Sequence, residues 1–326
     1  MFPTRFTELV GCEVPIQLAP MGQVVTPELA AAVTGAGGHA MLGLTSLDAD
    51  AIRVLLDRAE ALGAAPVGGN ILVPFIDPEV LEFAASRVPL LDFYLGAPDP
   101  ELVRIVHAAG ALAGWQATSA EEAEAAEAAG CDLVVAHGAE AGGRNPGGIA
   151  LLPLLAQVLD RVRIPVIAAG GIGTGRGIAA ALAAGADAVR LGTRFVAAAE
   201  SGAHPDYVAA LIAASPEDTM LTDAYSLMFP PHLHGSRVLR SAVDAAEAAT
   251  SESVGEMVLN GQTMPIPRFA PFPPLKGMTG NIAAMSLYAG QSVGAVRRVQ
   301  PAAEIMAEFV ADAERSLERG APAVPR

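Results

Sequence analysis

Two glycine-rich segments of the chain have residue types that could hold a phosphate group. The first, AGGIGTGRG, spans Ala169–Gly177, and the second, LGTRF, spans Leu191–Phe195. Glycines let the backbone come close to a ligand, and their free amide groups can point at it. A helix that begins just beyond such a loop adds a favourable dipole for an anion. The two segments together predict a phosphate site. They do not form a dinucleotide fingerprint, since position 178 is Ile rather than Gly.

A third glycine-rich segment, HGAEAGGRNPGG at His137–Gly148, is longer than a simple turn requires. Such a loop suits close approach of the backbone to a flat ring. It carries two residues that could do chemistry, Arg144 and His137. A guanidinium stays protonated near neutral pH, so Arg144 cannot be a general base, but it can bind an oxyanion. His137 could tune or relay protons; the alternative is a histidine bonded to the backbone.

The elements that must position these residues alternate between short apolar runs and Ala-rich stretches with helical spacing. Ser119 followed by Glu122 is a capping box that marks one helix start. We expect strands at Pro15–Leu18, Ala40–Leu42, Val67–Asn70, Leu91–Leu95, Ala111–Trp115, Leu133–Ala136, Pro165–Ala168 and Ala188–Leu191. We expect helices at Pro27–Thr34, Asp48–Leu62, Pro78–Ser86, Pro100–Ala109, Ser119–Ala129 and Gly177–Ala184.

These runs lack polar alternation, which indicates strands buried on both faces, as in a parallel sheet. Eight such strands with helices between them predict an α/β protein with a (β/α)8 barrel. The alternative is an open doubly wound sheet. Functional residues of such a barrel follow the carboxyl ends of its strands, and that is where all three glycine-rich segments stand.

The chain divides into three expected regions. Residues 1–203 form the barrel, residues 204–279 a small, mainly helical insertion or cap, and residues 280–326 helices that return to the barrel. Within the cap, His204–Pro274 is rich in Pro, Ser and Thr, and we expect helices without intervening strands. Gly280–Ala289 and Pro301–Leu317 again have helical spacing, and the tail GAPAVPR is expected to fray. The sequence leaves open whether the cap moves as a lid.

Composition excludes several classes of function. The chain has 326 residues, with 20 Lys+Arg against 35 Asp+Glu and a net charge of −15, which disfavours binding to nucleic acid or anionic lipid. The single lysine, Lys276, precedes Gly277, so no Walker A motif is present.

Cysteine and histidine usage points away from structural metal. Cys12 and Cys131 belong to no metal-spaced motif and predict neither a disulfide framework nor structural zinc. No histidine pair has metal-ligand spacing with a third partner, so we expect no metal. The start, MFPTRFTELVGCEVP, has no apolar signal core, and we expect a cytoplasmic protein without membrane association.

Several separated motifs carry a resemblance to a known family. The string PVIAAGGIGTGRGIAAALAAGADAVRLGTRFVAAAES at Pro165–Ser201 resembles the nitronate monooxygenase (2-nitropropane dioxygenase-like) family. APMG near the start, GGN at the third strand, EAGG at 140–143 and LYAGQSV at 287–293 match the same family in the same order. The resemblance runs from about Val14 to Phe309. Flavin-dependent enoyl-thioester reductases are related barrels.

The resemblance implies a TIM barrel that holds FMN noncovalently. Pro20, Met21 and Gly22 would back the isoalloxazine, and Asn70 and Gln116 would hydrogen-bond the ring or its ribityl chain. Ala141, Gly142 and Gly143 would lie along the ring. Gly170, Gly171, Gly192 and Thr193 would hold the phosphate, where the glycine-rich segments already predict it. Tyr288, Gly290, Gln291 and Ser292 would close the site.

Two departures from the family pattern bear on catalysis. Family members usually carry a histidine after EAGG, where this chain has Arg144, and another in a pattern like FHFG, where it has Tyr94. Proton abstraction from a neutral nitroalkane is therefore not expected, whereas oxidation of a preformed anion remains open. As catalytic residues we expect Arg144 to anchor the anion, Tyr94 to donate a hydrogen bond and His137 to tune or relay protons.

The first functional hypothesis is therefore an FMN-dependent oxidoreductase. It would oxidise a small, nitronate-like organic anion with O2. Because Arg144 stands where the family has a histidine, its substrate would differ from that of other family members. The alternative is an NAD(P)H-dependent flavin reductase acting on an enoyl-thioester or quinone-like acceptor. A third hypothesis is a flavin-binding protein that has lost turnover. The sequence leaves the physiological substrate and the formation of a homodimer open.

Overall fold

Eight parallel strands close into a barrel in the computed structural model, which describes residues 3–259 and 261–320. The order is β1-β2-β3-β4-β5-β6-β8-β9, and β9 pairs back with β1, Ile16 lying beside Val189. This confirms the (β/α)8 TIM barrel, and the open-sheet alternative is wrong. The strands are β1 Ile16–Leu18, β2 His39–Gly43, β3 Val67–Leu72, β4 Leu90–Tyr94, β5 Leu112–Ala117, β6 Leu133–His137, β8 Val166–Ala169 and β9 Ala188–Leu191.

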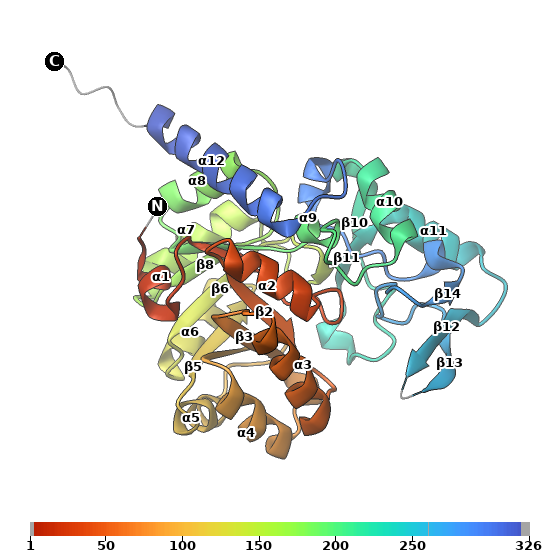
Figure 1. The fold of residues 1–326 in the computed structure, drawn as a ribbon, viewed down its shortest axis with the longest axis horizontal. Helices are drawn as coiled ribbons and strands as arrows, with labels where there is room; N and C mark the ends of the chain where they lie inside the picture. Colours follow the sequence, from red (N-terminus) through yellow and green to blue (C-terminus); the bar gives the residue numbers. More distant parts are fainter. Residues whose placement is uncertain (1–2, 260, 321–326) are drawn as a thin grey trace.

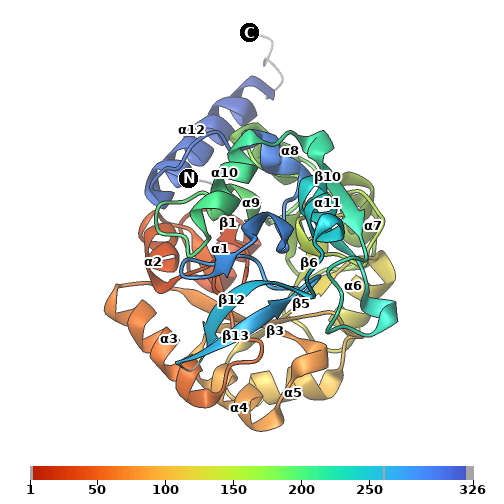
Figure 2. The ribbon, with the colours of Figure 1, turned by 90° about the vertical axis from the view of Figure 1, so that its right-hand side faces the viewer.

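Helices surround the barrel as a ring, which is seen end-on in Figure 2. Six of them begin where a Thr, Asp or Ser side chain accepts a hydrogen bond from a first-turn amide, which is the usual way a helix start is stabilised. These are α2 Pro27–Gly35, α3 Ala49–Ala61, α4 Pro78–Arg87, α5 Pro100–Ala108, α6 Ala120–Ala128 and α8 Gly175–Ala183. All six were expected from the sequence.

The sequence analysis did not identify α7 (Leu151–Arg161), and the reason is its start. The residue before it, Ala150, has no side chain that could cap it. The carboxylate of Glu140, eleven residues earlier, instead accepts the Leu151 amide at 2.9 and 3.1 Å. The expected capping box at Ser119 forms only in part. Ser119 caps Glu122 at 3.1 Å, but the Glu122 carboxylate accepts the amide of Thr118.

A short helix, α1 (Arg5–Val10), closes the amino end of the barrel. Its Phe6 is fully buried and packs in an apolar cluster with residues from the barrel interior, among them Met41, Leu90 and Leu133. Arg5 at the start of the helix donates to both carboxylate oxygens of Asp187, which precedes β9, at 2.8 and 2.6 Å. The amino end is thus sealed by apolar packing and tied at its rim by one ion pair.

Residues 204–296 lie over the opposite, carboxyl end of the barrel (Figure 1). This region contains helices α10 (Pro205–Ala213) and α11 (Arg240–Ala248), as expected, and has its own apolar cluster. The expectation of no strands is wrong. β10 (Thr219–Thr222) and β11 (Ser236–Leu239) form one small sheet, and β12 (Ser253–Leu259), β13 (Gln262–Pro267) and β14 (Thr279–Gly280) form another.

The physical reason for that error is the short length of these strands and their distant partners. β11 pairs on one side with β10 and on the other with β7, which is only Gly143–Arg144 in the loop after β6. No local period reveals such a strand. The Asn260-Gly261 dipeptide between β12 and β13 is the sequence signal that could have revealed their hairpin.

The last part of the chain differs from expectation at one place. Gly280–Ala289 is helical only over the single 3-10 turn Ile282–Ala284, and residues from Ile282 to Val296 pack in the apolar cluster of the cap. The helix expected at Pro301–Leu317 is confirmed as α12 (Ala302–Gly320), which packs on α8 and α2. The rest of the tail, residues 321–326, lies outside the described residues.

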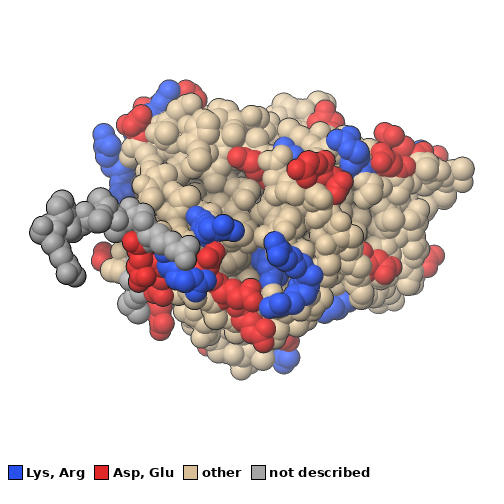
Figure 3. Space-filling model, turned by 90° about the horizontal axis from the view of Figure 1, so that it is seen from above, with Lys and Arg blue, Asp and Glu red and all other residues tan. Residues whose placement is uncertain are grey.

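Acidic and basic side chains are interspersed on the face that Figure 3 shows, on a surface that is otherwise uncharged. In the described part of the chain, no helix is both long enough and apolar enough to cross a membrane.

Candidate active site

A buried polar network lies inside the barrel near its carboxyl end. The Arg190 guanidinium, from β9, donates to a carboxylate oxygen of Asp92 in β4 at 2.5 Å, and the two side chains are 2% and 0% exposed. Arg190 also donates to Gln116 Oε1 at 3.1 Å. Asn70 in β3 donates through Nδ2 to the other Asp92 oxygen at 2.6 Å. Two residues expected to bind the flavin, Asn70 and Gln116, are therefore both fixed by one ion pair.

The sequence analysis missed Asp92 and Arg190, although a signal for them existed. Each is the single charged residue in an otherwise apolar strand, in LLDFY and AVRL. A charged side chain is almost never fully buried without a partner. Two lone charges of opposite sign in two buried strands therefore predict that the charges meet inside the barrel.

His137, the last residue of β6, has a buried imidazole with no partner. Neither ring nitrogen has a hydrogen bond in the described part of the chain. Burial, together with the nearby Arg190 charge, lowers the pKa of His137 to about 3. The ring is thus neutral near pH 7 and offers one donor and one acceptor. It lies 5.2 Å from the ring of Tyr94, measured between centroids.

The Tyr94 hydroxyl donates to the backbone carbonyl of Arg144 at 3.1 Å. Burial raises the pKa of Tyr94, so its proton stays on the oxygen near neutral pH. The structure therefore brings together the three residues expected to be catalytic. Tyr94 contacts both the histidine ring and the loop that carries the arginine.

The Arg144 guanidinium is bound by neutral groups of the cap. It stacks over the Phe229 ring at 4.0 Å from its centroid. It forms no ion pair with a carboxylate in the described residues, its Nε is buried without a partner, and burial lowers its pKa. The groups that accept from it are the carbonyls of Tyr225 (3.1 Å) and Leu233 and the hydroxyls of Ser226 (2.9 Å) and Ser236 (2.9 Å).

The loops after β6, β8 and β9 meet the segment after Ala289 at one place. Gly290 donates to Thr193 Oγ1 at 3.0 Å, and Gln291 donates to the Glu140 carbonyl at 2.9 Å. A Cβ added to Gly142 would lie only 2.4 Å from the Gly290 nitrogen, so only glycine fits there.

The remaining residues of the expected flavin site fall at or beside this junction. Gly170 and Gly171 have φ of +117° and +68°, values that favour glycine, and lie against the loop at 138–141. Met21 lies against Gly192, Gly22 against Gly43, and Ser292 against Gly173, while Pro20 is half-buried. The Tyr288 hydroxyl donates to the Pro271 carbonyl at 3.2 Å within the cap and lies on the side of Arg144.

The backbone at this junction fits a phosphate. In the described residues, the amides of Gly171, Gly192 and Thr193 donate to no other protein group. Unpaired amides from two adjacent loops are the usual donors to a phosphate in a barrel of this kind. No group of three or more His, Cys, Asp or Glu that could hold a metal occurs in the part of the chain described here.

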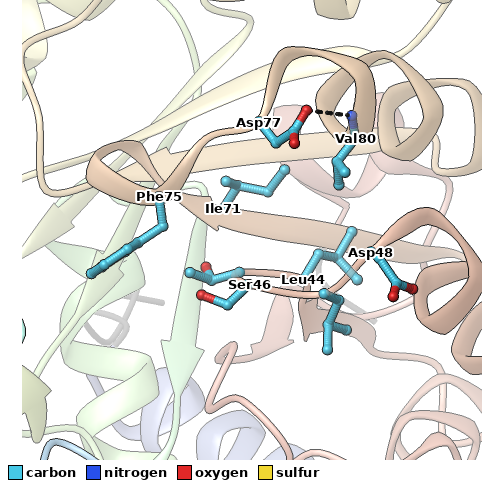
Figure 4. Close-up of a pocket in the computed structure, with 9 residues that line it drawn as sticks. Leu44, Ser46, Asp48, Ile71, Phe75, Asp77 and Val80 are labelled. Atoms are coloured by element: carbon cyan, nitrogen blue, oxygen red, sulfur yellow. Dashed lines mark hydrogen bonds between the residues drawn. The ribbon is translucent and has the colours of Figure 1, made fainter.

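A separate cavity of about 250 Å³ opens beside this site, between the loops after β2 and β3 (Figure 4). Asp48 and Asp77 on its wall are occupied in capping α3 and α4. Phe75 on its wall makes an edge contact, 5.3 Å between centroids, with Phe229, the ring over which Arg144 stacks. None of the residues expected to bind the flavin lines it.

Comparison with known proteins identifies relatives over nearly the whole length of the chain. A family model described as nitronate monooxygenase matches residues 3–82 and 76–312. The nitronate monooxygenase of Paraburkholderia phytofirmans is 32% identical, over 95% of this chain and 95% of that protein.

Two solved structures resemble the chain closely. FabK from Thermotoga maritima superimposes with a TM-score of 0.80 at 30% identity, covering 99% of this chain and 100% of that one. Nitroalkane oxidase from Streptomyces ansochromogenes superimposes with a TM-score of 0.76 at 32% identity, covering 98% of this chain and 100% of that one.

Proposed function

Because the chain belongs to the nitronate monooxygenase family and is an oxidoreductase of that family, we propose that it uses FMN to oxidise a small, nitronate-like organic anion with O2. The observation that carries this proposal is the environment of Arg144. Arg144 is half-buried, and withdrawing a cation from water without a carboxylate partner is costly. An anionic ligand relieves that cost. The unpartnered Nε–H of Arg144 is the donor through which the protein would hold such an anion.

The residues present fit FMN. The unpaired amides of Gly171, Gly192 and Thr193 would hold its phosphate. The Asn70 and Gln116 amides, which lie inside the barrel, would bond its ring or ribityl chain. When bound, FMN would supply the redox chemistry by accepting electrons from the anion and passing them to O2. The protein would supply position and charge.

The state of the nearby ionisable groups favours a preformed anion over a neutral nitroalkane. A general base works best with a pKa near the working pH. The pKa of His137 is lowered to about 3 and Arg144 is no base, so neither would readily remove a carbon-bound proton. His137 would instead accept or donate a hydrogen bond, and Tyr94 would hold the loop of Arg144 in place through its carbonyl.

The test is an anaerobic absorbance spectrum of the purified protein, before and after addition of propionate 3-nitronate. We expect flavin bands that bleach when the nitronate is added. If no flavin bands appear even after FMN is added, the cofactor assignment is wrong. If the bands persist unchanged with the nitronate but bleach with NAD(P)H, the reductase alternative holds instead.

Substitution of Arg144 tests whether its positive charge binds the anionic substrate. Arg144→His should abolish the oxidation of the anion if Arg144 anchors it. If the variant instead gains a nitronate oxidation that the parent lacks, the parent has diverged to another substrate. Arg268→His is the matched control, because Arg268 also lies in the cap, donates to a carbonyl (Ala249, 2.9 Å) and stacks on an aromatic ring.

A further inference from the structure

We propose that Arg190 and Asp92 are positioning residues that fix which atom of each flavin-facing amide points at the ligand. The inference rests on the proposed FMN site and assigns a role to two residues that do not touch the ligand themselves. Their ion pair is buried, and each partner holds one amide. Arg190 holds Gln116, and Asp92 holds Asn70.

The chemistry of the partners decides the direction of both amides. An ionised carboxylate only accepts hydrogen bonds, so Asn70 must turn its NH2 group toward Asp92 and its Oδ1 away. A guanidinium only donates, so Gln116 must turn its Oε1 toward Arg190 and its Nε2 away. With neutral amide partners, either orientation of each side chain would be satisfied. The ion pair removes that freedom.

Further contacts hold the guanidinium in place. Arg190 Nε donates to Gln17 Oε1 at 2.7 Å, and Gln17 Nε2 lies 3.1 Å from His39 Nδ1. Gln17 lies in β1, Asp92 in β4 and Gln116 in β5, so three strands other than its own fix Arg190. In such a buried network each hydrogen bond is stronger than it would be in water.

The outward atoms still have hydrogen-bonding capacity for a ligand. In the described residues no hydrogen bond to Asn70 Oδ1 is found, and Gln116 Nε2 has two N–H groups, of which one faces the Tyr94 hydroxyl and the other remains for a ligand. Both side chains belong to residues that are 6% exposed, whereas Asp92 is fully buried. The barrel therefore presents one fixed acceptor and one fixed donor. An oxidised flavin offers matching groups, a ring N–H and several ring nitrogen and oxygen acceptors.

A second ion pair, next to the same strand, supplies a matched control. Asp187, just before β9, pairs with Arg5 at the amino end of the barrel, three residues before Arg190. That pair is also an arginine–carboxylate contact, but it lies at the closed end and holds no amide side chain of the site.

The experiment titrates FMN into the full chain freed of flavin and follows the flavin fluorescence. In the double variant Asp92→Asn/Arg190→Gln, both amides lose their fixed direction. We expect the Kd for FMN to rise about fourfold. Each amide would be in the binding orientation only half of the time, so each would raise the Kd by a factor of about two. The absorbance bands of the bound flavin should shift as well. The control Arg5→Gln/Asp187→Asn should leave both the Kd and the bands unchanged.

Gln116→Glu is a second variant that keeps the fold. One carboxylate oxygen still accepts from Arg190, but the outward donor becomes an acceptor. We expect the Kd to rise tenfold or more. In this background the Asp92→Asn/Arg190→Gln change should cost only about twofold, because a carboxylate has no wrong orientation and only Asn70 remains affected.

The outcomes separate the inference from the proposed function. If the parent chain binds no FMN, the proposed function fails. If the parent binds FMN and the Asp92→Asn/Arg190→Gln variant binds it equally well, the positioning role is wrong while the function stands. The role is also wrong if the control pair raises the Kd as much, or if Gln116→Glu binds like the parent.

Discussion

The two ends of the barrel are built from the same eight strands, yet they are filled in opposite ways. At the amino end, Phe6 of α1 closes the interior against apolar side chains, and all of them are buried. At the carboxyl end, the interior holds an ion pair, two amides and the unpartnered ring of His137. Asp187 directly precedes β9 and Arg190 lies within it, three positions further along the chain.

The difference shows how one fold separates stability from function. Apolar burial at the closed end stabilises the barrel and needs no ligand. An unsatisfied buried polar group costs about 1–3 kcal/mol. The unpartnered groups at the open end therefore lower the free energy of unfolding of the ligand-free protein. We expect a bound ligand to recover that cost. Substitutions at the amino end should therefore change stability alone, and substitutions at the carboxyl end should change binding.

The largest expected effect is at the closed end. Phe6→Ala removes a fully buried aromatic side chain and should lower the free energy of unfolding by about 3–5 kcal/mol. Chemical denaturation followed by circular dichroism measures this loss. Under conditions where the variant is folded, its Kd for FMN should match that of the parent. A large change in FMN affinity would show that the two ends are not independent.

At the open end, Arg144→Met should affect the reaction more than the fold. Loss of the cation should reduce kcat/KM for propionate 3-nitronate about 100-fold, which corresponds to about 2.7 kcal/mol. Steady-state oxygen consumption measures it, with Arg268→Met as the control that retains activity. An unchanged kcat/KM would contradict the role of Arg144 as anion anchor.

The pH dependence of stability probes one buried histidine at each end of the barrel, His39 at the start of β2 and His137 at the end of β6. Burial lowers the pKa of both His39 and His137 to about 3, against 6.5 for an unperturbed histidine. Below pH 6.5 the unfolded chain binds protons that the folded chain cannot bind until about pH 3. The free energy of unfolding should therefore fall as the pH falls, by about 2 kcal/mol per histidine between pH 6.5 and 5.

Urea unfolding at pH 7.5 and 5 measures this loss. His39→Gln and His137→Gln should each remove one histidine's share of it. If both variants keep the full pH dependence of the parent, the histidines are not buried in their neutral form. His39 is of special interest because its ring also contacts Phe6, 5.9 Å between centroids, and so touches the apolar closure directly.

The smallest effect is expected at the rim of the amino end. The Arg5 side chain is 52% exposed, so its ion pair with Asp187 is screened by solvent. Arg5→Gln should lower the free energy of unfolding by no more than about 1 kcal/mol, as measured by denaturation, and should leave FMN binding unchanged. A loss comparable with that of Phe6→Ala would mean that the closed end depends on charge as well as on apolar packing.

Most of the barrel could be predicted from the sequence because its signals are local. Apolar runs mark the eight strands, and capping residues mark six of the helices. α7 was missed because its cap comes from Glu140, which lies in another loop. The strands of the cap were missed for a related reason, since β7 exists only through its pairing with β11, which lies more than ninety residues later and pairs with β10 on its other side.

The candidate site shows the same limit. The glycine segments and Asn70, Gln116 and Arg144 could be located from motifs. The partners that fix the two amides could not, because Asp92 and Arg190 lie on strands far apart in the chain and belong to no motif. The cap groups that hold Arg144 were likewise invisible, since they are mostly backbone carbonyls and serine hydroxyls.

The pairing of β7 with β11 makes the Arg144 loop part of the cap's sheet. This loop and the segment around Ser236 are therefore expected to change together during evolution. A chimera that exchanges residues 138–148 with a relative but keeps its own residues 219–239 would join two halves of different sheets. Changes of substrate in such a barrel should thus come as paired changes in both segments, in laboratory evolution as well as in nature.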